Sequence, residues 1–188
     1  DVIGIFNMLG AGDSAIVKVP AYLLDSNGSK RKYYSFWLNL VNFKTKITYS
    51  NEMAQHYQQQ TILDSLAIVD YIRNNEIKDC IQDEHGNWFT RTKTGTGKLI
   101  KQNDAVNLHY VGKLLNGNQF DNSYDRNQTF SFVVGKKQVI DGLDKAIQQF
   151  FIGDKGIIII PSRLGYGDKE VGKIPSNSVL IFEIEILE

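Results

Sequence analysis

The amino-acid sequence predicts an α+β fold, an antiparallel sheet of five to six strands curled around one short helix. Segments of alternating apolar and polar residues, typical of half-buried strands, recur through the second half of the 188-residue chain. One short helical pattern lies among these segments, and 42% of all residues are apolar, enough to form a packed core. A long helix and a partial second copy of the same unit are expected to precede this domain.

An internal repeat begins near the N-terminus. Residues 12–20 recur as residues 153–161, at an offset of 141 positions. In both copies apolar spacing predicts a short helix, a Gly-Asp pair follows it, and a β-branched run then ends in proline. A last alternating strand follows each copy, at residues 36–41 and 182–187. We therefore expect two related units, the first represented only by its C-terminal half.

The segment between the two copies predicts a long helix. From Ser50 to Asn75, apolar side chains recur every three to five residues, as they do in an amphipathic helix; they are Met53, Tyr57, Ile62, Leu66, Val69 and Ile72. Ser50 is expected to cap the N-terminus of this helix. A connecting helix packed on one neighbour is the favoured interpretation, and a helix that binds a separate partner is the alternative.

The second copy carries the signals of a complete unit. Strands are predicted over residues 106–111, 119–121, 129–133, 157–160 and 179–187, and one short helix over residues 138–150. The pair Asn116-Gly117 predicts a hairpin with a type I′ turn, in which both central residues have positive φ. The chain is therefore divided into a partial unit at 1–44, a helix and connection at 45–86 and a complete domain at 87–188.

Composition and motif spacing exclude several classes of function. The 21 Lys and Arg residues balance 21 Asp and Glu residues, which argues against a nucleic-acid binder, since such a protein needs a basic face. No apolar run approaches the roughly 18 residues that span a membrane, and Cys80, the single cysteine, cannot form a disulfide within the chain. The histidines are scattered without the spacing of zinc ligands. The glycines of residues 95–98 lack the spacing of a phosphate-binding loop. No metal and no cofactor are expected.

Ordered motifs run through most of the second unit. They include His109-Tyr110-Val111-Gly112, residues 117–123 and 135–143, Gly165-Tyr166-Gly167 and Ile174-Pro175. With this order and spacing, the unit resembles the FKBP-type peptidyl-prolyl cis-trans isomerase family. The resemblance implies an FKBP-like fold for residues 87–188. It also implies a protein-folding enzyme that accelerates rotation about X-Pro bonds and needs no nucleophile, metal or proton relay.

The resemblance also implies the residues of the site. Catalytic roles fall on Tyr110, Phe120, Asp121, Arg126, Phe130, Tyr166 and Phe182, and substrate contacts on Val139, Ile140, Leu143 and Ile174. Tyr166 would donate a hydrogen bond to a substrate carbonyl, and Arg126 would pair with Asp121. Leu143 stands where the family often has tryptophan at the pocket floor, so macrolide inhibitors are expected to bind weakly. In the first unit Asp25 takes the place of Tyr166, so that unit is expected to be non-catalytic.

The expected partners are proline-containing polypeptides and the family's macrolide inhibitors. Two such units joined by a long helix resemble exported bacterial members, which implies a location in the periplasm or envelope and a lipid anchor upstream of Asp1. The alternative function is a chaperone-like or inactive module that binds peptides without isomerase activity. A hydrolase that uses Asp121 and Asp125 as a carboxylate pair is a remote third interpretation.

Overall fold

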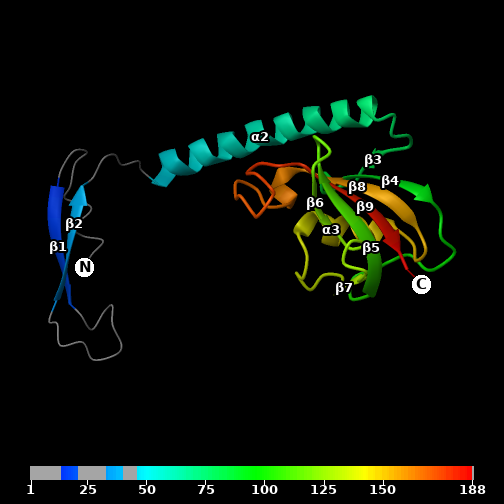
Figure 1. The fold of residues 1–188 in the computed structure, drawn as a ribbon. Helices are drawn as coiled ribbons and strands as arrows, with labels where there is room; N and C mark the ends of the chain where they lie inside the picture. The colour runs from blue at the N-terminus through cyan, green and yellow to red at the C-terminus, as the bar shows by residue number, and fades with distance from the viewer. Residues whose placement is uncertain (1–13, 21–32, 40–45, 188) are drawn as a thin grey trace. The chain divides into compact units, whose positions relative to one another are not determined.

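The computed structural model describes residues 14–20, 33–39 and 46–187 (Figure 1). Contacts divide the chain into two compact units, Asp1–Ala54 and Gln55–Glu188. The boundary lies inside the long helix, whereas the sequence-based division at residues 44 and 86 treats the whole helix as a linker. No helix in the described ranges combines the length and the apolar character needed to cross a membrane.

The first unit contains a two-stranded antiparallel ladder of β1 (Ser14–Pro20) and β2 (Tyr33–Asn39). Val17 pairs with Phe36 in this ladder, and Ile158 pairs with Phe182 in the second unit. The two ladders therefore pair equivalent residues of the repeat, because the loop between the two strands is shorter in the first copy. The internal repeat predicts this agreement. The helix expected before β1, the Gly12-Asp13 pair and Asp25 lie outside the described residues.

The long helix, α2 (Lys46–Asn74), has 29 residues. It ends where the sequence predicts, but it begins four residues before Ser50, so the prediction that Ser50 caps the helix is wrong. The residues from Lys46 to Tyr49 include no glycine or proline to stop helix propagation. Ser50 therefore lies inside the helix.

The face of α2 that packs on the second unit is not the predicted apolar stripe. Four members of that stripe are exposed, namely Tyr57, Ile62, Leu66 and Val69. The buried positions are Asp64 and Ile68, one helical turn apart, and Tyr71 and Ile72 lie half-buried at the end of the same face. Apolar spacing could not identify a packing face that is centred on a carboxylate.

The second unit is an antiparallel sheet, and the predicted α+β fold is confirmed. Its main path runs β3 (Ile81–Gln82), β4 (Trp88–Lys93), β8 (Lys155–Ile160), β9 (Leu180–Ile186), β5 (Ala105–Leu114) and β6 (Gln119–Asn122), and β7 (Phe130–Val133) also pairs with β5. The sequence reading missed β3 and β4. β3 has only two residues, and the last three residues of β4 are all exposed, so neither strand shows a clear alternation.

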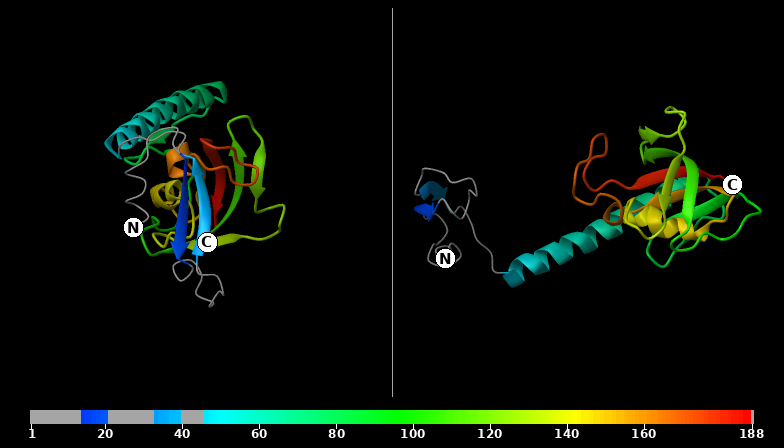
Figure 2. Two further views of the ribbon diagram at one scale, coloured as in Figure 1. Left: turned by 90° about the vertical axis from the view of Figure 1, so that its left-hand side faces the viewer. Right: turned by 90° about the horizontal axis from the view of Figure 1, so that it is seen from below.

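A short helix, α3 (Asp141–Ala146), lies against the curled sheet and continues as a 3-10 turn, η2 (Ile147–Gln149) (Figures 1 and 2). It begins three residues later than predicted because Ile140 is extended, with φ −60° and ψ 147°. Asp141 and Asp144 in its first turn complement the helix dipole. Val139 and Ile140 are therefore freed from the helix and face the cavity described below.

The hairpin between β5 and β6 is confirmed, but its turn is not type I′. Only Gly117 has a positive φ, of 84°, and its N–H donates to the carbonyl of Leu114 at 2.9 Å. Asn116 keeps a negative φ while its side-chain carbonyl accepts from the N–H of Asn118 at 3.0 Å. The ladder then carries an irregularity between Gly112 and Lys113.

The sheet of the second unit has cores on both faces. Ile158 and Phe182 belong to the larger core around α3, whereas the neighbouring residues Ile159 and Ile181 pack with Ile68 of α2 on the other face. This explains why residues 157–160 are all isoleucine, because a strand buried on both faces has no polar alternation. The packing of α2 thus belongs to the stability of this unit.

Candidate active site

A cavity of about 450 Å³ opens between the strands and α3 of the second unit. Strands β5, β6, β7 and β9 supply its walls, and the loop after residue 165 borders it. Most of its lining is aromatic or aliphatic: Tyr110, Phe120, Phe130, Val139, Ile140, Leu143, Val171, Ile174 and Phe182. The polar lining consists of Asp121, Gln138, Tyr166 and Lys173, with Gly172 beside them.

Strand register brings the aromatic walls together. Gly112 of β5 lies opposite Phe182 of β9 on one side and Asp121 of β6 on the other. A Cβ atom at Gly112 would lie 2.5 Å from the ring of Phe120. The missing side chain at position 112 therefore lets the Phe120 ring lie close against β5 and form a wall of the cavity.

The aromatic rings hold one another in place at angles. The ring centroids of Tyr110 and Phe130 are 5.6 Å apart with planes at 75°, and those of Phe120 and Phe182 are 5.7 Å apart at 78°. Edge-to-face contacts at these distances are favourable. The cavity therefore has preformed apolar walls.

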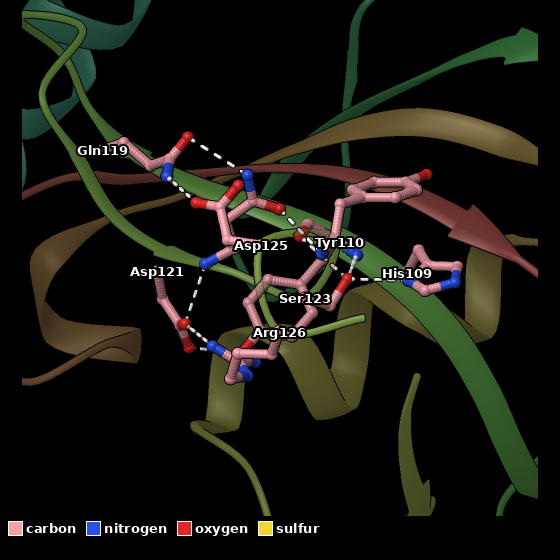
Figure 3. Close-up of polar contacts among 9 residues, drawn as sticks. His109, Tyr110, Gln119, Asp121, Ser123, Asp125 and Arg126 are labelled. Carbon is pink, nitrogen blue, oxygen red and sulfur yellow. Dashed lines mark hydrogen bonds and ion pairs between the residues drawn. The ribbon is translucent and has the colours of Figure 1, made fainter. Parts of the chain in front are cut away.

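One edge of the cavity is polar, and its side chains form hydrogen bonds with one another (Figure 3). The hydroxyl of Tyr110 and the guanidinium of Arg126 both donate to the carboxylate of Asp121. Arg126 also donates to the Tyr110 hydroxyl at 3.2 Å, and its guanidinium carbon lies 5.8 Å from the centroid of the tyrosine ring. The predicted pairing of Arg126 with Asp121 is present.

These contacts set the charge of the edge. Burial raises the pKa of Asp121, but hydrogen bonds from Tyr110, Arg126 and the N–H of Asn122 outweigh it and hold that pKa below its ordinary value. Burial, with the hydrogen bond to Asp121, raises the pKa of Tyr110. At neutral pH the aspartate is thus a charged acceptor and the tyrosine a neutral donor, and the two orient each other.

The side chain of Ser123 holds the backbone of Tyr110 in place (Figure 3). Its buried hydroxyl accepts from the Tyr110 N–H at 2.8 Å and lies 3.0 Å from Nδ1 of His109. The ring of His109 in turn stacks on Tyr124 at 4.4 Å. Ser123 lies in the motif of residues 117–123, but the sequence does not reveal its role, because that role depends on a contact between β5 and the turn after β6.

Tyr166 stands apart from the other tyrosines of the site. Its side chain is 38% exposed at the rim of the cavity, and its hydroxyl has no hydrogen-bond partner among the described residues. It is therefore available to donate to a bound molecule.

The structure brings all eleven residues proposed from the sequence to one place. Ten of them line the cavity, and Arg126 reaches it through Asp121 and Tyr110. Sequence reasoning missed Gln138, Val171, Gly172 and Lys173. Gln138 lies within the motif of residues 135–143, but no spacing rule marks the three loop residues, whose positions depend on the fold of the loop. Asp125 instead accepts from Gln119 at 3.0 Å.

Comparisons with known proteins agree with this architecture. Residues 97–187 match the family model described as FKBP-type peptidyl-prolyl cis-trans isomerase. The chain is 47% identical over 88 residues to FK506-binding protein 2 of Dictyostelium discoideum, covering 46% of this chain and 66% of that protein. It is 40% identical over 111 residues to FKBP-type peptidyl-prolyl cis-trans isomerase FkpA of Buchnera aphidicola, covering 59% of this chain and 43% of that protein.

Solved structures give the same assignment. The crystal structure of AtFKBP13 matches with a TM-score of 0.56 and 34% identity, over 58% of this chain and 98% of that one. The crystal structure of FkpA from Escherichia coli matches with a TM-score of 0.59 and 26% identity, over 80% of this chain and 74% of that one. The chain spans 43% to 66% of the length of the two curated relatives described above. Through its second unit, the chain belongs to the FKBP-type peptidyl-prolyl cis-trans isomerase family.

Proposed function

We propose that this protein accelerates cis-trans rotation about X-Pro bonds in folding polypeptides. The observation that carries the proposal is the preformed aromatic cavity with a free tyrosine hydroxyl at its rim. Uncatalysed rotation crosses a barrier of about 18–20 kcal/mol because twisting removes the double-bond character of the C–N bond. It takes tens to hundreds of seconds, slow enough to limit folding.

The cavity would favour the twisted imide over the planar one. The proline ring enters between Phe120, Phe130 and Phe182 and rests on Leu143, which removes water from the imide. Twisting removes the resonance between the nitrogen and the carbonyl, so the carbonyl oxygen carries less negative charge and binds water less strongly. The twisted imide therefore loses less than the planar one when the apolar wall displaces water. The Tyr166 hydroxyl donates to a carbonyl of the bound chain and holds its direction.

The polar edge would act by orientation rather than by proton transfer. The carboxylate of Asp121 already accepts hydrogen bonds from Tyr110 and Arg126, so it is not placed to take a proton from the substrate. This arrangement keeps the Tyr110 ring at a fixed angle to Phe130 and Phe182. The reaction then requires binding and desolvation alone.

The partners follow from the same cavity. We propose proline-containing polypeptides as substrates and weak binding of macrolide inhibitors, since Leu143 offers a smaller floor than tryptophan. We also propose an exported location in the bacterial periplasm or envelope, supported by the similarity to bacterial FkpA proteins. Fractionation of the source cells tests the location.

Exchange of an X-Pro peptide measured by NMR tests the activity. The wild-type chain should speed the exchange, and Phe120→Ala should lower kcat/KM by about tenfold or more, since a lost aromatic wall removes at least ~1.4 kcal/mol of binding. Tyr166→Phe should lower it by about threefold to tenfold. Tyr124→Phe is the matched control, because Tyr124 bonds Glu185 and does not line the cavity.

The alternative function gives a different result in the same experiment. A chaperone-like module would shift the resonances of the peptide without changing the exchange rate. That outcome for the wild-type chain would exclude the isomerase and favour the binding module.

A further inference from the structure

A buried carboxylate joins α2 to the segment that follows β8. Asp64 is 3% exposed, and its Oδ2 accepts from both the N–H and the hydroxyl of Ser162, at 2.8 and 2.7 Å. Its Oδ1 accepts from the side-chain amide of Gln60 at 2.7 Å. The Asp64 carboxylate thus accepts three hydrogen bonds. One comes from Gln60 of the same helix, and two come from Ser162, which lies 98 residues further along the chain.

Packing alone does not account for a carboxylate at this position. Burying a charged group costs several kcal/mol unless hydrogen bonds replace its water. An apolar residue would cover the sheet without that cost, as Ile68 does one turn later with 1% exposure. The particular property of Asp64 is that it accepts two hydrogen bonds from Ser162.

Ser162 begins the chain segment that borders the cavity. It is the first residue of a 3-10 turn, η3 (Ser162–Leu164), and its carbonyl accepts from the N–H groups of Gly165 at 3.0 Å and Gly167 at 2.8 Å. The carbonyl of Gly167 then accepts from the N–H of Asn177 at 2.7 Å. A continuous path of hydrogen bonds thus leads from Asp64 to both ends of the loop.

The loop between these anchors has little packing of its own. Residues 168–173 are all exposed, and Gly167 and Gly172 have positive φ values of 62° and 58°. Lys173, which lines the cavity, lies on this stretch, and Tyr166, which also lines it, lies just before it, between Gly165 and Gly167. Within the loop, Val171 and Ile174 exchange two hydrogen bonds of 2.9 Å each. The position of the loop, and of Tyr166 just before it, therefore depends on the hydrogen bonds at its base.

We propose that Asp64 is a positioning residue for isomerisation: it holds Ser162, and through Ser162 it sets the place of Tyr166 at the cavity. This inference rests on the proposed function. It makes the C-terminal half of α2 part of the catalytic domain, in addition to its role as a connection.

Three variants of the full chain test the proposal. Asp64→Ala removes the acceptor and should lower kcat by about fivefold or more, with little change in KM, as Tyr166 loses its orientation. Asp64→Asn should retain most activity, because its side-chain oxygen still accepts from Ser162 and Gln60 can reverse its amide. Ile68→Ala is the matched control on the same helix face, and it should lower stability without changing kcat at a temperature where every variant is folded.

Two further measurements identify the route of the effect. In the Asp64→Ala background, the additional change Tyr166→Phe should cost much less than it does in the wild-type chain. Amide hydrogen exchange at Gly167 and Asn177 should become at least tenfold faster in Asp64→Ala and remain unchanged in Ile68→Ala.

The proposal is overturned if Asp64→Ala and Ile68→Ala lower activity in proportion to their loss of stability, or if the effects of Asp64→Ala and Tyr166→Phe simply add. It is also overturned if exchange at Gly167 and Asn177 does not respond to Asp64→Ala. A wild-type chain without catalysis would instead remove the proposed function, and the amide exchange would still decide whether Asp64 orders the loop.

Discussion

At the scale of single residues, the charged carboxylate of Asp121 orients the side chains at the polar edge of the cavity. Asp121 shares its carboxylate between Tyr110 and Arg126, and the arginine also covers the tyrosine ring. The side chains of Arg126 and Asp121 are 44% and 37% exposed, so their attraction adds little to folding stability. Its main consequence is the fixed position of Tyr110 in the cavity wall.

We expect Arg126→Ala to lower kcat/KM by about threefold to tenfold with little loss of stability. In the wild-type chain the pKa of Asp121 is lowered from its ordinary value, so the contribution of the edge is present at neutral pH and is lost as the pH falls through the lowered pKa. In the variant the loss should begin at a higher pH. The measurements are kcat/KM from pH 3 to 8 and NMR titration of the Asp121 carboxyl carbon.

Arg91→Ala is the control for that variant. Arg91 lies over the ring of Phe151, away from the cavity, and its removal should leave the pH profile unchanged. Identical profiles for wild type and Arg126→Ala would contradict the role assigned to the ion pair.

Lys173 should influence which proline sites are bound. It lines the cavity, and no ion pair with another described residue neutralises it. Lys173→Glu should shift the preference by about threefold from peptides with an acidic residue beside the proline to peptides with a basic one, more strongly at low salt. Competition between two such peptides measures the shift. Lys169→Glu, on the same loop but outside the lining, should not produce it.

At the scale of elements, β5 organises the site. It pairs with β6, β7 and β9, so the register of one strand places Tyr110, Phe120 and Phe182 around the same space. Gly112 is the position where this arrangement is tightest, because the ring of Phe120 occupies the space of a missing Cβ.

We expect Gly112→Ala to lower kcat/KM by at least tenfold, since the new methyl group would push the Phe120 ring out of the wall. Overpacking should also cost about 1–3 kcal/mol of unfolding free energy. Gly156→Ala is the matched control, because its Cβ would meet the carbonyl of Thr90 and the ring of Phe150, away from the cavity. Equal activity in the two variants at equal folded fraction would contradict the role of Gly112. Thermal melting and peptide exchange provide the measurements.

At the scale of the whole molecule, the second unit extends into the long helix. Ile68 packs with Ile159, Val179 and Ile181 on the sheet face opposite α3. Removing α2 would expose this second core and leave Ser162 without its buried acceptor.

A fragment of residues 55–188 should therefore be more stable than a fragment of residues 87–188. The difference should be at least ~3 kcal/mol, because the loss of Ile68 alone is comparable to a buried isoleucine-to-alanine change. For a domain of this size that corresponds to roughly 10 °C or more in Tm. Thermal unfolding followed by circular dichroism checks the order, and equal Tm values would show that α2 is only a connection.

Local patterns in the sequence predict the internal repeat, five of the seven strands of the second unit and eleven proposed site residues, but not β3, β4 or the lining residues Gln138, Val171, Gly172 and Lys173. Alternation is a local property of a strand with one buried face, so β5 and β7 were readable from a few residues each. The family resemblance carried by these motifs proposes eleven site residues, from Tyr110 to Phe182, and the structure brings them together around one cavity.

The buried face of α2 and the contacts that hold the loop of Tyr166 depend on how the helix and the sheet pack together. The side chains of a helix point outward in all directions around its axis. The surface that the helix packs against therefore decides which face is buried. Here the sheet selected Asp64 and Ile68 in place of the more apolar stripe of Ile62 and Leu66. The contact between Asp64 and Ser162 joins residues 98 positions apart, and no local pattern encodes a hydrogen bond that exists only once both elements are folded.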